Sequence, residues 1–426
     1  MDNLTHSLTG ALAAKLLENK TNTKVDAKQQ RALFWLFVVC ANLPDLDVLL
    51  GLWGDPIFST KHHRGLTHSV LFAPIMAVLP ALLWCRFTVS IKIPPASQQI
   101  PPLRGVRGVF LRITKSLLSR RESSRSASPL NSNDTSDISL APLKGGIHEA
   151  SSLSSMIPEP SGPPQRGSRE GAQSAMKAFA RFYFVALAGV LIHILFDVIT
   201  SYGTRLLLPF SETRFALDWM FIIDPFFTIS LTVMLGLGKL MPKRRKLLVS
   251  VAAIFVVSYL AAEMLCSRLA HERAQQALMR SNIKAGKVSA LPQPLSIFKW
   301  KALAQTEDAV YQAFFSLWDK APPRFTKFEN ASDDFVTLAL ATAEVQWYLT
   351  FARHPWIRST SQGEHQIVEL MDLQFSIDEA LINALGASER PLPFIMRLVF
   401  SRNGELLRSD FSESVILRAN QFNGPP

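Results

Sequence analysis

Long apolar segments separated by short polar ones make up most of the first two thirds of the chain. Five of them are long enough to cross a bilayer as helices, the second when the preceding HRGLTHS is counted: residues 32–53, 70–85, 179–200, 217–238 and 247–266. Residues 2–18 form a shorter helix with a leucine at every fourth position, typical of a re-entrant or interfacial segment. The pattern predicts a mainly α membrane protein, a polytopic helical bundle.

Two regions depart from this pattern. Residues 90–178 are rich in Ser, Pro, Gly and Arg, which bury too little apolar surface to offset the entropy of ordering, so we predict a disordered insert. Residues 267–426 contain no further spanning run, and segments such as IFKWKALAQ and HQIVELMDLQF alternate as strands do. The expected organisation is a membrane domain in two parts (1–89 and 179–266), a cytoplasmic insert (90–178) and a soluble α+β domain (267–426), with one helix over 331–354 packed on its sheet.

The formal net charge of the chain is +11. The basic residues gather between apolar segments, in residues 24–31, in the insert and in residues 239–246. Cytoplasmic loops of membrane proteins carry such an excess of Lys and Arg, so the charge indicates orientation and no nucleic-acid partner is expected. When all three basic regions lie in the cytoplasm, the spans alternate without conflict and residues 267–426 lie on the other side.

Ionisable side chains lie at the ends of the apolar segments, where they are costly unless paired, hydrated or bound to a metal. Pro44 is expected to break the first segment, which allows Asp45 and Asp47 to turn towards one centre. His193 and Asp197 have the i, i+4 spacing that lets two helical side chains meet one metal ion.

The orientation argument places these clusters on one membrane face, opposite the basic regions. We therefore predict one shared metal centre, whose candidate ligands are His6, Asp45, Asp47, His63, His68, His193 and Asp197. Two further residues have open assignments. Arg64 either neutralises a substrate phosphate or anchors the chain at the interface by snorkelling. Asp224 either acts as a general base or caps a helix that begins at Pro225.

Imidazole and carboxylate ligands without a thiolate favour zinc, with manganese and iron as alternatives, and the three cysteines form no Cys-x-x-Cys pair. The candidate ligands outnumber those of one tetrahedral zinc, so two ions can be present. A divalent metal would activate water against an ester or phosphodiester, and at a membrane face the natural substrate is a lipid headgroup. A non-enzymatic metal-binding membrane protein and a transporter are alternatives, although the inverted repeats of many transporters are not seen in the sequence.

Five spaced motifs carry a resemblance to a known family. MDNLTHSLTG, NLPDLD, HRGLTHS, the H-x-x-x-D of residues 193–197, and TSYGT with the later PF and FIIDP occur in this order over about residues 2–230. Together they resemble the bacterial inner-membrane, metal-dependent hydrolase family, one branch of which is described as LexA-binding. The resemblance implies a multi-pass protein of the bacterial inner membrane with hydrolase activity, and the candidate ligands given above are the positions that match.

The C-terminal region resembles the longer branch of that family in two places, Phe298-Lys299-Trp300 and Asp372-Leu373-Gln374-Phe375. The insert over residues 90–178 departs from the compact family pattern. This departure does not touch the candidate ligands, and no cytoplasmic partner is carried over from the family. The resemblance supplies no substrate.

Overall fold

A computed structural model of the 426-residue chain describes residues 1–20, 27–52, 60, 62–90, 166–378, 383, 390–392, 394–412 and 415–417. One compact unit comprises Met1–Thr88 with Met176–Pro426, and a second comprises Val89–Ala175. The candidate ligands all belong to the first unit. Most of the predicted insert, residues 91–165, lies outside the described residues.

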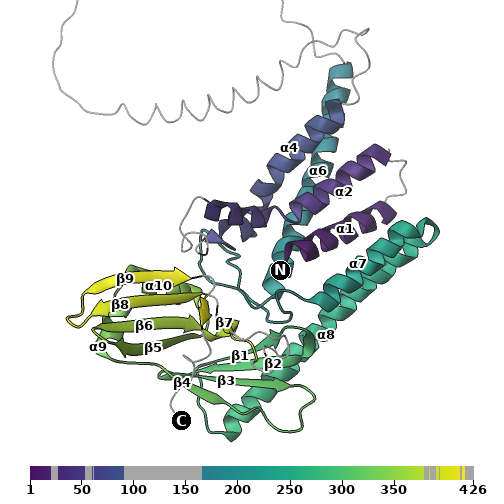
Figure 1. Ribbon diagram of the computed structural model, residues 1–426. Coiled ribbons are helices and arrows are strands. Elements are labelled where there is room, and N and C mark those ends of the chain that lie inside the picture. Colours follow the sequence, from purple (N-terminus) through teal and green to yellow (C-terminus); the bar gives the residue numbers. More distant parts are fainter. Residues whose placement is uncertain are drawn as a thin grey trace, which may run out of the picture. The chain divides into compact units, whose positions relative to one another are not determined.

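The N-terminal part of the first unit is helical. Its helices are α1 (Asn3–Lys20), α2 (Ala27–Cys40), α4 (Ala73–Ser90), α6 (Arg166–Ile199), α7 (Pro225–Leu240) and α8 (Arg245–Arg280), with 3₁₀ turns η1 (Pro44–Leu52), η2 (Leu66–His68) and η3 (Pro242–Arg244). In Figure 1, α2, α4 and α6 lie side by side, and α7 and α8 form an antiparallel hairpin. The prediction that the chain breaks at Pro44 is confirmed, because α2 ends at Cys40 and a 3₁₀ helix begins at Pro44.

Small residues bring the helices of this part close together. A Cβ atom on Gly189 of α6 would lie 2.8 Å from the Cβ of Cys40 in α2, so only glycine allows these backbones to approach so closely. Ala73, Ala77 and Ala81 of α4 are fully buried in the same cluster. Interfaces of this kind are typical of helices that pack within a membrane.

Two helices are long and apolar enough to cross a membrane, Ala175–Ile199 and Pro242–Arg280, while the apolar helices Ala73–Thr88 and Pro225–Leu240 are shorter. Large apolar side chains also lie on the outside of the helices, for example Leu79, Ile229 and Val257, whose exposed fractions are 65, 62 and 70%. An apolar surface of this extent requires an apolar surrounding or a partner. The predicted five spans therefore stay a prediction, with two supported by length and hydropathy.

The C-terminal domain contains two antiparallel sheets. One has the order β1 (Lys287–Gln293), β2 (Ser296–Gln305), β3 (Ala309–Ser316) and β4 (Thr326–Glu329). The other has the order β5 (Pro355–Gln362), β6 (His365–Asp372), β8 (Ile395–Ser401) and β9 (Leu406–Ser412), and β7 (Arg390–Leu392) pairs with β10 (Val415–Leu417). Helices α9 (Asp334–Leu340) and α10 (Ala343–Phe351) pack on the second sheet, and η4 (Leu373–Phe375) follows β6.

Three sequence predictions need correction. The single helix expected over residues 331–354 is two helices, because Thr342 caps α10 with its side chain and so starts a new helix. The fourth predicted span becomes helical only at Pro225, where Asp224 forms the N-cap. Residues 166–178 of the predicted insert are helical and begin α6, since REGAQSAMKAFA is rich in good helix formers.

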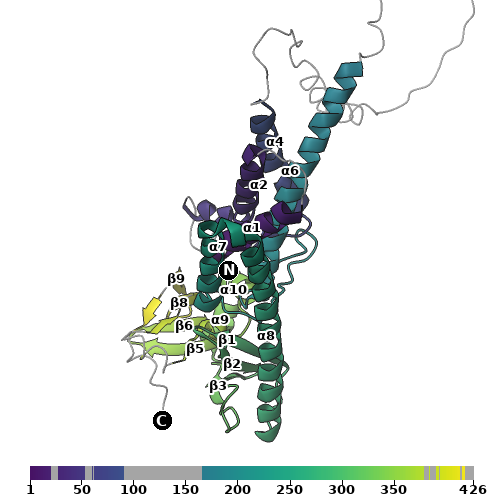
Figure 2. The ribbon, with the colours of Figure 1, turned by 90° about the vertical axis from the view of Figure 1, so that its right-hand side faces the viewer.

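The helical part and the C-terminal domain are joined along α8 and through the loop after α6. Helix α8 is about 54 Å long, and its last turns bury Cys266, Ala270 and Ala274 against the first sheet; Figure 2 shows it running past β1, β2 and β3. Tyr202, which follows α6, is buried in the core cluster of α9, α10 and the second sheet. Arg353 forms a two-point ion pair with Asp218 and donates to the carbonyl of Ser201.

Candidate metal centre

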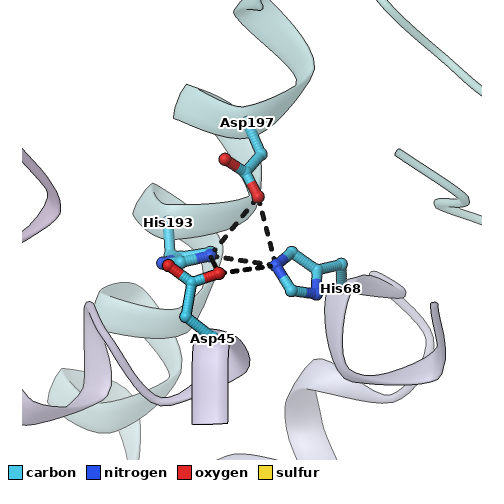
Figure 3. A group of neighbouring side chains, drawn as sticks. All are labelled: Asp45, His68, His193 and Asp197. Carbon is cyan, nitrogen blue, oxygen red and sulfur yellow. Dashed lines mark hydrogen bonds and ion pairs between the residues drawn. The ribbon is translucent and has the colours of Figure 1, made fainter. Parts of the chain in front are cut away.

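Three segments of the chain bring histidine and aspartate side chains to one place at the C-terminal end of α6. Helix α6 supplies His193 and Asp197, η2 supplies His68, and η1 supplies Asp45 (Figure 3). His68, His193 and Asp197 are fully buried, and the Asp45 side chain is 10% exposed. The four residues can each direct one ligand atom to a common point.

The distances between these ligand atoms fit a tetrahedral ion. His68 Nε2 lies 3.1 Å from His193 Nε2 and 3.1 Å from Asp197 Oδ2. Asp45 Oδ1 lies 3.3 Å from His68 Nε2 and 3.4 Å from His193 Nε2, and Asp197 Oδ2 lies 3.4 Å from His193 Nε2. Zinc bonds of about 2.0–2.1 Å in a tetrahedron place ligand atoms about 3.3–3.4 Å apart, so the four atoms have the spacing of one zinc site.

Hydrogen bonds on the far side of each imidazole determine which nitrogen faces the centre. His193 Nδ1 lies 2.7 Å from the carbonyl oxygen of Ala41, which can only accept, so Nδ1 carries the proton. Thr67 donates to Asp47 at 2.6 Å, which leaves its oxygen to accept from His68 Nδ1 at 3.0 Å. Both Nε2 atoms therefore point lone pairs at each other and at two carboxylate oxygens, an arrangement that a cation would stabilise.

A second group shares Asp45 with the first. Asp45, Asp47 and His63 can also direct ligand atoms to one point. His63 Nδ1 lies 3.0 Å from Asp47 Oδ1, and the His63 side chain is 25% exposed, so this group faces the edge of the site. Asp45 belongs to both groups, so the two groups are adjacent, and the presence of two ions stays a prediction.

Asp197 is held from behind by cationic groups and by His6. Its Oδ1 atom contacts the amino nitrogen of Met1, and it lies 3.1 Å from Arg64 Nη2 and 3.4 Å from His6 Nε2. The His6 ring stacks on His193 at 3.7 Å between centroids, and neither of its ring nitrogens has a hydrogen bond within the described residues. His6 is therefore a buried imidazole next to the centre, and among the described residues it belongs to neither ligand group.

Arg64 is part of the scaffold of the centre. Its guanidinium donates to Asp197 and, at 3.0 Å, to Thr200 Oγ1, and it lies over the ring of Tyr202 at 4.6 Å. The turn that carries it is tight: Arg64 has a φ of 54°, and a Cβ on Gly65 would lie 2.6 Å from the carbonyl oxygen of His62. Glycine at position 65 therefore allows His63, Arg64 and His68 to reach the centre from one short segment.

The structure puts Asp224 in a different environment. Its Oδ1 accepts from the backbone N–H of Phe227 at 3.0 Å as the N-cap of α7, and its Oδ2 accepts from the hydroxyl of Tyr259 at 2.7 Å. Asp224 is not a member of either ligand group among the described residues. These contacts correspond to the capping alternative, and a role as general base has no contact here that supports it.

Three residues at the centre were not identified from the sequence. Thr67 and the carbonyl of Ala41 fix the two imidazole tautomers, and the Tyr202 ring lies 5.9 Å from the His63 ring. Thr67 could have been noticed, because it lies between the two candidate histidines of one motif. A backbone carbonyl and a tyrosine in the following loop give no signal of this kind in a single sequence.

Comparison with known proteins places these motifs in a family. Residues 1–269 match a family described as YdjM inner membrane protein. Neither a curated protein nor a solved structure matches the chain. The matched region covers well over half of the chain and contains all seven candidate ligands, so the resemblance noted from the motifs is confirmed. The chain belongs to the YdjM inner membrane protein family.

Proposed function

We propose that this protein is a membrane-bound metal-dependent hydrolase that acts at the non-cytoplasmic face of the inner membrane. The observation that carries the proposal is the convergence of His68 Nε2, His193 Nε2, Asp45 and Asp197, with four acceptor atoms spaced for one divalent ion. The all-nitrogen-and-oxygen ligand set favours zinc, with manganese or iron as the alternatives. When bound, such an ion supplies an activated water and a positive charge for the developing oxyanion.

The second ligand group leaves a coordination position open for water or substrate. Asp45, Asp47 and His63 offer three protein ligands, the number that hydrolytic zinc sites use while one position is kept for water or substrate. Asp47 also orients His68 through Thr67, so it supports both groups. The partial exposure of His63 gives solvent and substrate a way to this side of the centre.

The orientation proposed from the charge pattern is supported by the two ends of α1. His6, near the start of α1, lies at the metal centre, whereas Glu18, about 18 Å further along the helix, pairs with Arg245 at 2.9 Å. Arg245 begins α8 directly after the basic turn η3, so the basic turn lies at the end of α1 opposite the ligands. A cytoplasmic basic turn would put the centre and the C-terminal domain on the non-cytoplasmic side, where a lipid headgroup is a natural ester or phosphodiester substrate.

A non-enzymatic metal site is the second candidate. It is favoured by the buried group of two histidines and two aspartates, because four protein ligands are typical of closed structural zinc sites. The two candidate functions differ in whether they require the second ligand group. A structural site has no need of His63, whereas a hydrolase requires it at the open edge.

The test uses the full-length protein purified in detergent, stripped with a chelator and reloaded with zinc, manganese or iron. The substrates are bis(p-nitrophenyl) phosphate and p-nitrophenyl butyrate. The proposal expects turnover of at least one substrate that disappears on stripping, returns on reloading and is lost in His63→Ala, while the exposed C-terminal His365→Ala retains it. Full metal occupancy without turnover of either substrate would instead support the non-enzymatic site.

A further inference from the structure

Two arginines lie directly opposite each other in the loop that follows α6. The backbones of Thr204 and Phe215 exchange two hydrogen bonds of 2.9 Å in an antiparallel bridge, which sets Arg205 against Arg214. The Arg205 backbone N–H donates to the carbonyl of Arg64 at 3.3 Å. Arg205 Nη2 lies 3.2 Å from the point that a Cβ of Gly65 would occupy, so its guanidinium is next to the turn that carries Arg64.

Among the described residues, the Arg214 guanidinium contacts uncharged groups. Within the described part of the chain no carboxylate pairs with it; it contacts the carbonyl of Gly203 at 3.5 Å and lies over the Phe351 ring at 5.2 Å. Burial lowers its pKa to about 10, and the nearby charges of Arg205 and Arg64 act in the same direction. Like charges directly opposite across two strands are destabilising, so this arrangement has a cost that an anion would remove.

The other two arginines are in different situations. Arg64 already directs its guanidinium to Asp197 and Thr200, which makes it a positioning residue for a ligand. The exposed side chain of Glu212 provides a negative charge near Arg205. Of the three arginines, Arg214 is therefore the one whose guanidinium contacts uncharged groups among the described residues.

The arginine pair is close to the open edge of the metal centre. The Tyr202 ring lies 4.6 Å from the Arg64 guanidinium, 5.9 Å from the His63 ring and 6.0 Å from the Phe351 ring, on which Arg214 rests. Tyr202 thus contacts both the partly exposed ligand His63 and Phe351, the ring on which Arg214 rests. An anionic group held by the arginines would lie beside the second ligand group.

We infer that Arg205 and Arg214 bind the phosphate of the substrate, so that the enzyme acts on a phosphoester and not on a neutral carboxylic ester. The inference rests on the proposed hydrolase function and names its substrate class. Guanidinium groups match phosphate because each can donate two parallel hydrogen bonds to its oxygens. Arg64, the phosphate-binding candidate of the sequence analysis, keeps its guanidinium on Asp197.

The experiment measures inorganic phosphate binding to the full-length, metal-loaded protein by isothermal titration calorimetry. The variants are Arg205→Gln, Arg214→Gln and Arg214→Lys, and the control is Arg402→Gln, an exposed arginine in the β8–β9 turn. Each glutamine variant should weaken phosphate binding at least about tenfold, since a charge-assisted hydrogen bond is lost, and Arg214→Lys should restore part of it. Metal content should be unchanged in all of them, which also shows that the variants are folded.

Activity assays separate this inference from the proposed function. The glutamine variants should raise the KM for bis(p-nitrophenyl) phosphate and for phosphatidylglycerol in mixed micelles, or for only one of them, which would identify the source of the phosphate. Phosphate binding that depends on the arginines without any hydrolysis would overturn the proposed function and leave this inference standing. Equal phosphate affinity in the wild type and both glutamine variants, or turnover of the butyrate ester alone, would overturn the inference.

Discussion

Two regions of the molecule bury ionisable side chains, and they satisfy them in opposite ways. In the C-terminal domain, the fully buried Lys301 of β2 donates to the carbonyl oxygens of Leu373, Gln374 and Ser376 at 2.6–2.8 Å. Asp372 accepts hydrogen bonds from the backbone N–H groups of Arg353, His354 and Gln374. The Lys301 ammonium and the Asp372 carboxylate therefore have their hydrogen bonds within the protein, without a ligand.

The buried ionisable groups at the C-terminal end of α6 show the opposite balance of donors and acceptors. The Nε2 atoms of His68 and His193 face each other at 3.1 Å, and carboxylate oxygens of Asp45 and Asp197 complete the group. Acceptors meet acceptors, and Asp197 Oδ2 and both nitrogens of His6 have no hydrogen bond among the described residues. Burial alone therefore does not distinguish a functional site from a structural one, whereas the balance of donors and acceptors does.

The largest effect is expected in the structural network. Asp372→Ala would leave three backbone N–H groups without their acceptor and should destabilise the C-terminal domain by about 3–5 kcal/mol. Thermal denaturation of the full-length protein, followed by near-UV circular dichroism, measures this. Metal bound per folded protein should stay at the wild-type level, and a selective loss of metal would remove the distinction between the two regions.

Substitution of a candidate metal ligand should chiefly lower metal affinity, the reverse of what is expected for Asp372→Ala. Asp197→Ala removes one ligand and leaves Arg64 without its carboxylate, so metal affinity should fall by about a hundredfold or more. Competition with a chromophoric chelator measures the affinity. If Asp197→Ala binds metal as tightly as Asp372→Ala does, Asp197 is not a ligand.

A residue of the second ligand group that also orients a ligand of the first group should have a smaller effect on the first ion. Asp47→Asn weakens the hydrogen bonds that orient His68 through Thr67, and it removes the negative charge next to His63. Metal affinity should fall by about 10- to 100-fold, less than in Asp197→Ala. An equal loss in both variants would mean that Asp47 is itself an essential ligand of the first ion.

The smallest expected effect is the pH dependence of stability that arises from Lys301 in the structural network. Burial lowers the pKa of Lys301 to about 7 from its ordinary value of 10.5. Between these values the unfolded chain binds the extra proton, so stability should rise with pH, by at most about 1.4 kcal/mol per pH unit. Comparing the Tm values of the wild type and Lys301→Met at pH 7, 8 and 9 checks this. A wild type with the same flat profile as the variant would show that the three carbonyls keep Lys301 charged throughout.

Much of the candidate metal centre could be predicted because its signals are local. The i, i+4 spacing of His193 and Asp197 and the break at Pro44 are properties of short segments. Asp224 shows the limit of such reasoning, since a carboxylate before proline suits both a cap and a catalytic base, and only its contacts with Phe227 and Tyr259 separate the two.

What the sequence could not supply depends on contacts between distant segments. Tyr202 is far in sequence from the C-terminal core into which it packs, and Arg205 meets Arg214 only through a backbone bridge. The longer-branch motif Asp372-Leu373-Gln374-Phe375 is visible in the sequence, but its physical role depends on Lys301 of a distant strand, which donates to its carbonyls. The alternation of residues along one strand does not reveal which other segment that strand contacts.

The central claim is that His68 and His193 bind the same metal ion. It is tested most directly by measuring metal per chain in the full-length protein, reloaded with zinc and dialysed, together with zinc K-edge X-ray absorption. The wild type and His365→Ala should hold at least one zinc with imidazole ligands at about 2.0–2.1 Å, and His68→Ala should hold less than about a tenth of that amount. Equal zinc in His68→Ala and the wild type, or a wild type that retains none, would contradict the account.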